Sequence, residues 1–361
     1  MIAEPGSFRD PHSFVAYTKA GILVRYLHDE YLPHFNHLIS SDLYNILFKQ
    51  KKIVGHQLAD KRDYDAVKEY GTVLRPETIP FISYGYEWSF SQLKAAALLT
   101  LSINKLALEH GMILKDANVY NIQFIGYRPV LIDTASFEIY EDQKPWSAYQ
   151  QFCQHFLAPL ALCSYVNVHL RKIALTNIDG IPLELCVSLL PFRAKFNIGL
   201  YFHLFMHSRM QVKHQSKQIP VNSQRIALPK KKLLSLLSHL ENTVKKLKWN
   251  MPVSQWSNYY INTNYTEIGK DQKRKIVSEY VDSLHCKTAI DIGANNGEYS
   301  SILSDKGIYT VALDMDEVSV ENNYVMSSKN SNENLLPLQS NIINPTPGIG
   351  WNNKERKSFL Q

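Results

Sequence analysis

The sequence predicts a protein of mixed class, in which an α+β unit of two lobes is followed by an α/β unit built on parallel strands. Three observations carry this prediction. Residues 91–110 form a long helical pattern that leads into two short strand patterns flanked by acids. Residues 288–297 form an apolar run that ends in an acid and a glycine turn. Two further apolar runs, at 309–314 and 335–341, follow at the spacing of repeated β–α units.

The first predicted elements form a small lobe. Residues 14–17 and 22–26 predict a hairpin with Gly21 in its turn. Residues 29–49 carry apolar side chains at helical spacing. Residues 79–88 predict a strand that runs into a hinge. Residues 91–110 predict a helix that ends before Gly111, because glycine is the common residue just after a helix C-terminus.

Three polar residues follow this helix at a characteristic spacing: Asp116, Asn121 and Asp133, the last after a predicted strand and turn. The pattern resembles the catalytic region of protein kinases. This resemblance implies that Asp116 orients or deprotonates an acceptor hydroxyl, while Asn121 and Asp133 hold Mg²⁺ beside ATP. Oxygen ligands suit that hard cation. The implied fold is kinase-like, with an N-lobe at 1–88 and a helical C-lobe at 89–260.

The same region departs from the kinase pattern. Leu114 stands where the family has His or Tyr, and Asp133 is followed by Thr134 and Ala135 instead of Phe and Gly. No glycine-rich loop precedes residue 20, and Arg25 is the nearest basic residue on a predicted strand. A guanidinium is no simple replacement for an ammonium group, and phosphoryl transfer without these parts loses electrostatic stabilisation. We therefore expect this unit to bind a partner or present a substrate rather than transfer phosphate.

Two side-chain patterns in the helical region have structural explanations. His203 and His207 have the spacing of zinc ligands on one helix face, but no third ligand is evident, so packed histidines are the preferred interpretation. Cys153 and His155 resemble a nucleophile and its base, but close neighbours point in different directions on a helix. Pro159 is expected to kink or end the helix predicted at 150–162.

A basic segment from Lys213 to Lys248 joins the two units. Its lysines alternate with leucines at helical spacing, which predicts a solvated helix face, with RNA or anionic lipid as the alternative partner. A net charge of +6 does not require nucleic acid, so that partner is not favoured. Trp249 and Trp256 are expected to pack between the units.

The stretch 288–297 carries the main functional pattern. Gly293 and Gly297 allow a tight turn and a close approach of the backbone to a ligand. The spacing D-x-G-x-N-x-G resembles motif I of the class I S-adenosylmethionine (SAM) methyltransferases, which implies a Rossmann-like domain at 270–361 with SAM as the cofactor. The alternative is a glycine turn that closes a β–α–β unit without a ligand. The residues that would shape the methionine and ribose side are Asp291, Gly293, Ala294, Asn295 and Gly297.

Two downstream residues extend this pattern. Asp314 ends the second predicted strand about twenty residues after the turn, where a carboxylate accepts the ribose hydroxyls, and Asp316 is the nearby substitute. Asn341 ends the third predicted strand, where the family faces the adenine amino group. Only three of the seven strands of that family fit between residues 276 and 341. We therefore expect a C-terminally truncated domain, or one that a partner chain completes.

The residues beyond the third strand predict a loop at 344–353 and the start of a helix at 354–361. Because the strand that would follow the third is absent, no catalytic residue can be named. The order of the two patterns resembles a group of bacterial SAM-dependent methyltransferases, some of them nodulation-related. Residues 79–90, 114–124 and 344–352 carry this resemblance.

Composition limits the remaining possibilities. Four cysteines without a C-x-x-C pair, no signal peptide and no long apolar run predict a cytoplasmic protein without a membrane span. Two functions follow from the sequence. The first is a SAM-dependent methyltransferase of unknown acceptor, and the second is a kinase-like nucleotide-binding or interaction module with a vestigial methyltransferase segment.

Overall fold

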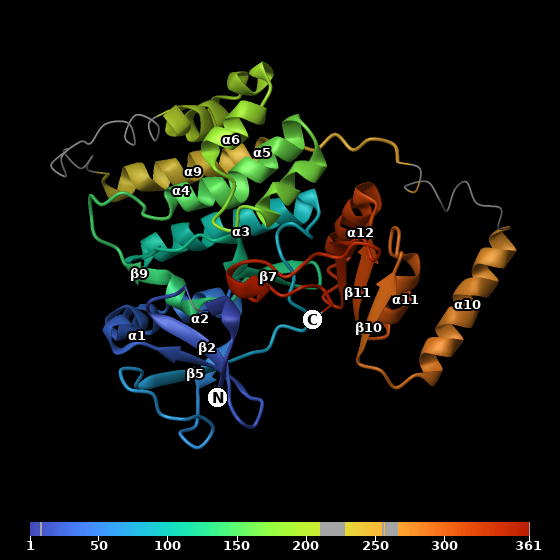
Figure 1. Ribbon diagram of the computed structural model, residues 1–361, viewed down its shortest axis with the longest axis horizontal. Coiled ribbons are helices and arrows are strands. Elements are labelled where there is room, and N and C mark those ends of the chain that lie inside the picture. The colour runs from blue at the N-terminus through green and yellow to red at the C-terminus, as the bar shows by residue number, and fades with distance from the viewer. Residues whose placement is uncertain (8, 210–227, 255, 257–265, 361) are drawn as a thin grey trace.

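The computed structural model describes residues 1–7, 9–209, 228–254, 256 and 266–360 (Figure 1). The protein is mixed α/β, and its strands lie in several small sheets. The blue N-terminal sheet, the green and yellow helices and the red parallel sheet occupy three parts of the molecule (Figure 1).

A five-stranded antiparallel sheet forms the N-terminal part, in the order β1-β2-β3-β5-β4. The predicted hairpin is confirmed, because β2 and β3 pair around a turn in which Gly21 has a φ of +76°. The helix predicted at 29–49 is divided, because Asp42 adopts a left-handed backbone with a φ of +62°. The elements of this part are β1 (Ile2–Ala3), β2 (Ser13–Tyr17), β3 (Leu23–Leu27), α1 (Leu32–Ser40), α2 (Leu43–Lys49), β4 (His56–Leu58) and β5 (Thr72–Pro76).

The long helix α3 (Phe90–Glu109) confirms the prediction for residues 91–110. The Ser89 side chain accepts a hydrogen bond from the Gln92 backbone N–H, and the Gln92 side chain accepts one from the Ser89 N–H. This capping box satisfies two N–H groups at the start of the helix. Gly111, with a φ of +72°, follows the last turn.

The strand predicted at 79–88 is wrong. These residues form turns, in which the Glu87 N–H donates to the Tyr84 carbonyl. The Gln123 side chain bonds both the N–H and the carbonyl of Ser83. Local bonds to side chains and turn carbonyls therefore take the place of pairing with a neighbouring strand.

After α3, the helical region begins with two antiparallel two-stranded sheets, β6-β9 and β7-β8, and continues as short helices. Pro159 does not end the predicted helix, because the π-helical segment η5 (Cys153–Leu157) leads directly into α5. Proline has no N–H to donate to the preceding turn, and the wider π-helical turn before Pro159 tolerates this missing hydrogen bond. The elements are β6 (Met112–Leu114), β7 (Ile122–Ile125), β8 (Arg128–Leu131), β9 (Phe137–Ile139), α4 (Tyr149–Phe152), α5 (Ala158–Tyr165), η6 (Val168–Leu175), α6 (Leu183–Leu189), η7 (Phe192–Phe196), α7 (Ile198–Leu200), η8 (Tyr201–Met206) and α9 (Lys230–Lys246).

Helix α9 confirms the predicted amphipathic helix in the basic segment. Leu233, Leu237, Leu240 and Val244 are buried on one face. Its lysines are exposed or half-buried. The part of that segment from Lys213 to Arg225 lies outside the described residues.

Three parallel strands in the order β10-β11-β12 form the last sheet and confirm the three strands predicted there. Strands β11 and β12 are almost fully buried, whereas Ile290 and Ile292 of β10 are 53% and 58% exposed. Among the described strands of this sheet, β10 and β12 are the two edge strands. The elements are α10 (Glu267–Ser283), β10 (Thr288–Ile292), α11 (Glu298–Asp305), β11 (Tyr309–Asp314), α12 (Glu317–Lys329) and β12 (Leu335–Gln339).

The parallel sheet packs closely against the helical region. One apolar core contains Leu93 of α3 together with Leu313, Leu336 and Tyr324. The Gln92 side chain donates to the Pro337 carbonyl at 3.0 Å, so the buried cap of α3 also holds β12. The predicted division of the chain into the ranges 1–88, 89–260 and 270–361 stays a prediction.

The helix predicted at 354–361 is wrong. A short 3₁₀ turn, η9 (Trp351–Asn353), is followed by turns, and Arg356 pairs through its backbone with Ile349. Asn352 and Asn353 lie directly before the predicted helix and both have positive φ angles, so the turn at η9 does not continue into it as a right-handed helix. In the described part of the chain, no helix combines the length and the apolar character needed to cross a membrane.

Candidate functional site

The glycine turn and two of its predicted partner residues meet at one edge of the parallel sheet. Because the strands are parallel and in register, their carboxyl ends share this edge. The N–H groups of Gly293 and Ala294 both donate to the Leu313 carbonyl, at 2.8 and 2.9 Å. Gly293 and Gly297 have φ angles of +77° and +80°, the region that glycine adopts without strain. The turn therefore has the backbone geometry for which its glycines were singled out.

Asp314 is the central side chain of this edge. One carboxylate oxygen accepts the Asn295 N–H at 2.7 Å, and the other accepts the Asp316 N–H at 2.8 Å. The carboxylate thus connects the glycine turn with the start of α12. Each carboxylate oxygen has a second lone pair, so Asp314 keeps acceptor capacity for ligand hydroxyls.

The other predicted residues have different environments. The Asp291 carboxylate accepts the Ser300 hydroxyl of α11 at 2.6 Å. Ala294 and Asn295 are buried, and the Asn295 amide donates to the Trp256 carbonyl at 2.9 Å. Asn341 follows directly after a residue whose N–H bonds the Asp314 carbonyl, and its own side chain accepts the Ile343 N–H. The structure therefore brings the turn, Asp314 and Asn341 together, while Asp291 is directed toward α11.

Asp316 has a structural role. Its carboxylate caps α12 by accepting both the N–H and the hydroxyl of Ser319, at 2.9 and 2.7 Å. The Ser254 hydroxyl donates to the same oxygen at 2.9 Å. A capping carboxylate is favourable at a helix N-terminus, so Asp316 stabilises the start of α12 and Asp314 stays the candidate acid of this edge.

A buried ion pair beside this edge had no signal in the sequence. Glu317 begins α12, and its carboxylate lies 2.7 Å from the Arg171 guanidinium of η6. Arg171 is 1% exposed and Glu317 is 6% exposed. The two residues are 146 positions apart in sequence, so no local spacing could pair them.

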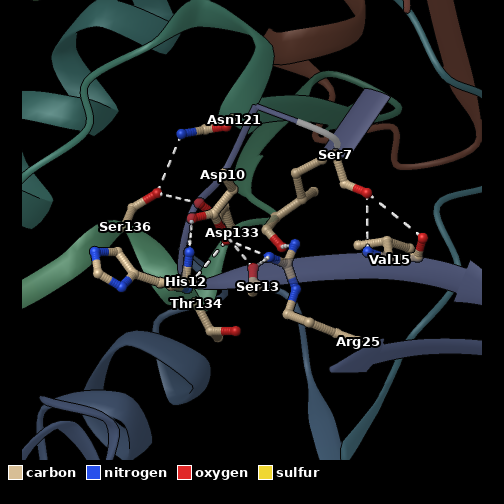
Figure 2. Close-up of polar contacts among 12 residues, drawn as sticks. Ser7, Asp10, His12, Ser13, Val15, Arg25, Asn121, Asp133, Thr134 and Ser136 are labelled. Carbon is tan, nitrogen blue, oxygen red and sulfur yellow. Dashed lines mark hydrogen bonds and ion pairs between the residues drawn. The ribbon is translucent and has the colours of Figure 1, made fainter. Parts of the chain in front are cut away.

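The kinase-like residues gather at a second place, and Figure 2 shows two of them, Asn121 and Asp133. Arg25 of β3 donates to the Asp133 carboxylate at 2.5 Å and to the Ser13 hydroxyl at 2.9 Å. Asp133 also accepts the Ala135 N–H and the Ser136 hydroxyl, at 3.0 and 2.6 Å. Its charge is therefore balanced by an internal cation and its oxygens are already hydrogen-bonded.

Asp116 and Asn121 lie next to Asp133. The Asn121 amide donates to the Ser136 hydroxyl at 3.1 Å, and this hydroxyl in turn donates to the Asp133 carboxylate (Figure 2). Burial, together with the nearby Asp133 charge, raises the pKa of Asp116 above its usual value, and hydrogen bonding to Asn121 opposes the shift. The structure thus brings the three residues together. Over the described ranges, no group of three His, Cys, Asp or Glu side chains is placed to hold a metal.

The two other patterns from the sequence are part of the packing. The Tyr149 hydroxyl and the His239 ring contact the two ring nitrogens of His203, each at 2.7 Å. Burial, with His239 nearby, lowers the pKa of His203 to about 3. Cys153 is fully buried in the main apolar core, and burial raises its pKa, so its thiol stays protonated.

Glu87 connects the loop before α3 to β12 and makes stability depend on pH. Its backbone carbonyl accepts the Gln339 N–H at 2.8 Å, and burial raises the pKa of its carboxyl group from an ordinary 4.5 to about 7. The folded protein therefore holds this proton more tightly than the unfolded chain does. We expect the free energy of unfolding to fall, by up to about 3 kcal/mol, as pH rises from about 4.5 to about 7.

Glu87→Gln tests this expectation, because the amide can still accept the Tyr84 N–H. Urea unfolding of both proteins at about pH 5 and about pH 7.5 gives the comparison. The variant should lose most of the decrease in stability between the two pH values. An equal decrease in both proteins would assign the pH dependence to other groups.

The comparisons with known proteins give one informative match. The chain is 34% identical over 291 residues to nodulation protein NoeA of Rhizobium meliloti (strain 1021). The match covers 80% of this chain and 61% of that protein, so the chain spans less than two thirds of its relative. No protein-family model matches the chain. The similarity fits the nodulation-related group that the sequence resembles.

Proposed function

We propose that the edge formed by the glycine turn, Asp314 and Asn341 is the cofactor-binding half of a SAM-dependent methyltransferase. The observation that carries this proposal is the position of Asp314, which lies at the end of β11 and is tied to the glycine turn by the Asn295 N–H. A carboxylate at the end of the second parallel strand is suited to accept ribose hydroxyls.

The space around the turn supports this assignment. Among the described residues, apart from Gly293 and its chain neighbours, no heavy atom lies within 4 Å of the place where a side chain would begin at Gly293, so a ligand can approach the backbone there. Asn341 stands at the end of the neighbouring strand, where its amide would face an adenine edge. Such a site would act by holding the sulfonium methyl group in line with an acceptor, because alignment is the main contribution to a displacement of this kind. The acceptor is not assigned.

A calorimetric titration with SAM tests the proposal. The unaltered chain should bind SAM, and Asp314→Ala should weaken binding at least about tenfold, as expected when a charge-assisted hydrogen bond is lost. Asp305→Ala is the matched control, because Asp305 is exposed at the far end of α11. Unchanged affinity in Asp314→Ala would contradict the assignment. Asp291→Ala should also weaken binding, since it removes the acceptor that holds Ser300 near the turn.

The second candidate function concerns the N-terminal part. We propose that it is a kinase-like interaction module that retains the place of a Mg·ATP site. One observation favours this candidate: Asp116, Asn121 and Asp133, which follow α3 in the sequence, lie close together in the structure. The Arg25–Asp133 ion pair argues against phosphoryl transfer, because Mg²⁺ would have to compete with an internal cation for the same carboxylate.

A further inference from the structure

Residues 349–359, which we term the clasp segment, form a closed loop of their own. Ile349 and Arg356 exchange two backbone hydrogen bonds, both 3.0 Å long. The loop between them turns at η9, and the Glu355 carboxylate accepts the Trp351 N–H at 3.0 Å. Gly350 has a φ of +79° and lies so close to Glu355 that a Cβ there would stand 2.4 Å from the carboxylate. The clasp segment is therefore a folded unit rather than an extended strand end.

The clasp segment touches three stretches that are far apart in sequence. The first is the loop between β1 and β2, where the Arg356 guanidinium donates to the Gly6 carbonyl at 3.1 Å. In the same loop, Lys357 pairs with Glu4 at 2.9 Å, and the Arg9 guanidinium donates to Glu355 at 3.1 Å. These bonds fix the clasp segment to the N-terminal sheet.

The second stretch is the loop before α3, where the Tyr84 hydroxyl accepts the Lys357 N–H at 2.9 Å. The rings of Phe81 and Phe359 lie 6.1 Å apart in the same place. The third stretch is the turn that carries Asn121, where the Arg356 guanidinium stacks over the Tyr120 ring at 4.1 Å. A half-buried cation over an aromatic face is a stabilising contact.

These three stretches surround the clasp segment, and we call the space that it occupies between them the cleft. The β1–β2 loop continues into Asp10 and Ser13, which bond to each other and lead to the Arg25–Asp133 pair (Figure 2). The turn at Tyr120 leads to Asn121 on the opposite side. In Figure 1 the red coil at the C-terminal end lies between the blue sheet and the helical region. Arg356 thus contacts both sides of the cleft that leads to the kinase-like residues.

We propose that this cleft is a peptide-binding site whose ligand is the clasp segment of the same chain. The proposal deepens the second candidate function and does not depend on SAM binding. The chemistry that recognises the peptide is specific: a backbone carbonyl and an aromatic face for Arg356, and a carboxylate for Lys357. A nucleotide beside Tyr120 would therefore have to displace the clasp segment, because Arg356 covers the Tyr120 ring.

Hydrogen exchange of the full chain tests the proposal. Arg356→Glu places a carboxylate beside the Gly6 carbonyl, where neither group can donate a hydrogen bond, and removes the contact with the Tyr120 ring. We expect backbone exchange in residues 4–9, 118–121 and 349–359 to accelerate at least about tenfold. Lys354→Glu is the matched control, because it makes the same change of charge on an exposed residue of the clasp segment. Equal exchange in both variants would overturn the proposal.

A synthetic peptide of residues 347–361 tests whether the cleft binds the clasp segment when the two are not covalently linked. Added to Arg356→Glu, it should restore slow exchange in residues 4–9 and 118–121, and the same peptide with Glu at position 356 should not. No restoration by either peptide would overturn the proposal. If Arg356→Glu does not fold, Lys357→Glu serves as the second variant, since it reverses the charge of the exposed pair with Glu4.

Mg·ATP is the competing ligand. Under the proposal, millimolar Mg·ATP leaves the exchange of the unaltered chain unchanged, because the clasp segment fills the cleft. Protection of residues 118–121 by Mg·ATP, with the clasp segment still protected, would overturn the proposal. A SAM titration of the same variants reports on Asp314 separately, so failure of one site is distinguishable from failure of the other.

Discussion

Replacing Arg171 by alanine is expected to lower the free energy of unfolding by about 3–5 kcal/mol, the usual effect of leaving a buried charge without its partner. Glu317 would lose the guanidinium 2.7 Å away while remaining 6% exposed. Burial pushes the pKa of Glu317 upward, but Arg171, His169 and Lys172 more than offset it, so the pKa lies below its usual value. The carboxylate is therefore charged, and the alanine variant must bury that charge or open the junction around α12.

Urea unfolding measures this effect, and two variants control it. Lys172→Ala should cost less than about 1 kcal/mol, because Lys172 is 37% exposed and its ammonium lies 4.0 Å from the same carboxylate. The double variant Arg171→Met, Glu317→Leu should recover most of the loss, since an apolar pair needs no charge compensation. A decrease of less than 1 kcal/mol in Arg171→Ala would show that solvent reaches Glu317.

The two glycines of the glycine turn, Gly293 and Gly297, should respond differently to alanine. Gly297 faces the Asn323 amide, and a Cβ would stand 2.5 Å from it, so Gly297→Ala combines a strained φ with overpacking. We expect a loss of about 2–4 kcal/mol. Gly293 has a similar φ but no atom within 4 Å, so Gly293→Ala should cost only about 1 kcal/mol.

The effect on SAM binding should follow the opposite order. The methyl group of Gly293→Ala would enter the open space that we assign to the cofactor, so this variant should fold and lose SAM affinity. Unfolding curves and SAM titrations of both variants give the comparison. Normal SAM binding by Gly293→Ala would place the ligand elsewhere, even if both stability changes agree with expectation.

These predictions share a physical basis, because α12 links the candidate cofactor edge to the helical region. Its first turn holds Glu317 against Arg171, and one turn later Glu321 accepts the N–H of Ser91 at the start of α3. Farther along, the Tyr324 hydroxyl donates to the Tyr127 carbonyl. Asp314 and Asp316 stand directly before this helix. Changes at the junction should therefore also disturb the edge where SAM is proposed to bind.

Much of the local structure followed from the sequence. The hairpin at Gly21, the helix ended by Gly111 and the three strands 288–292, 309–314 and 335–339 were predictable, because glycine conformation and apolar periodicity act over a few residues. The glycine turn and Asp314 were predictable for the same reason. The predictions for 79–88 and 354–361 were wrong, because bonds from Gln123 and Glu355 decide those loops.

The sequence by itself singled out the candidate site residues, namely the glycine turn with Asp314, and the set of Asp116, Asn121 and Asp133, whose roles stay predictions. The tertiary structure decided their surroundings. It pairs Arg25 with Asp133 across 108 positions and Arg171 with Glu317 across 146, and it places Arg356 over Tyr120. Such contacts depend on burial and long-range packing, which leave no periodic trace in a sequence. The physical state of each site therefore depends on partners that only the folded chain brings near.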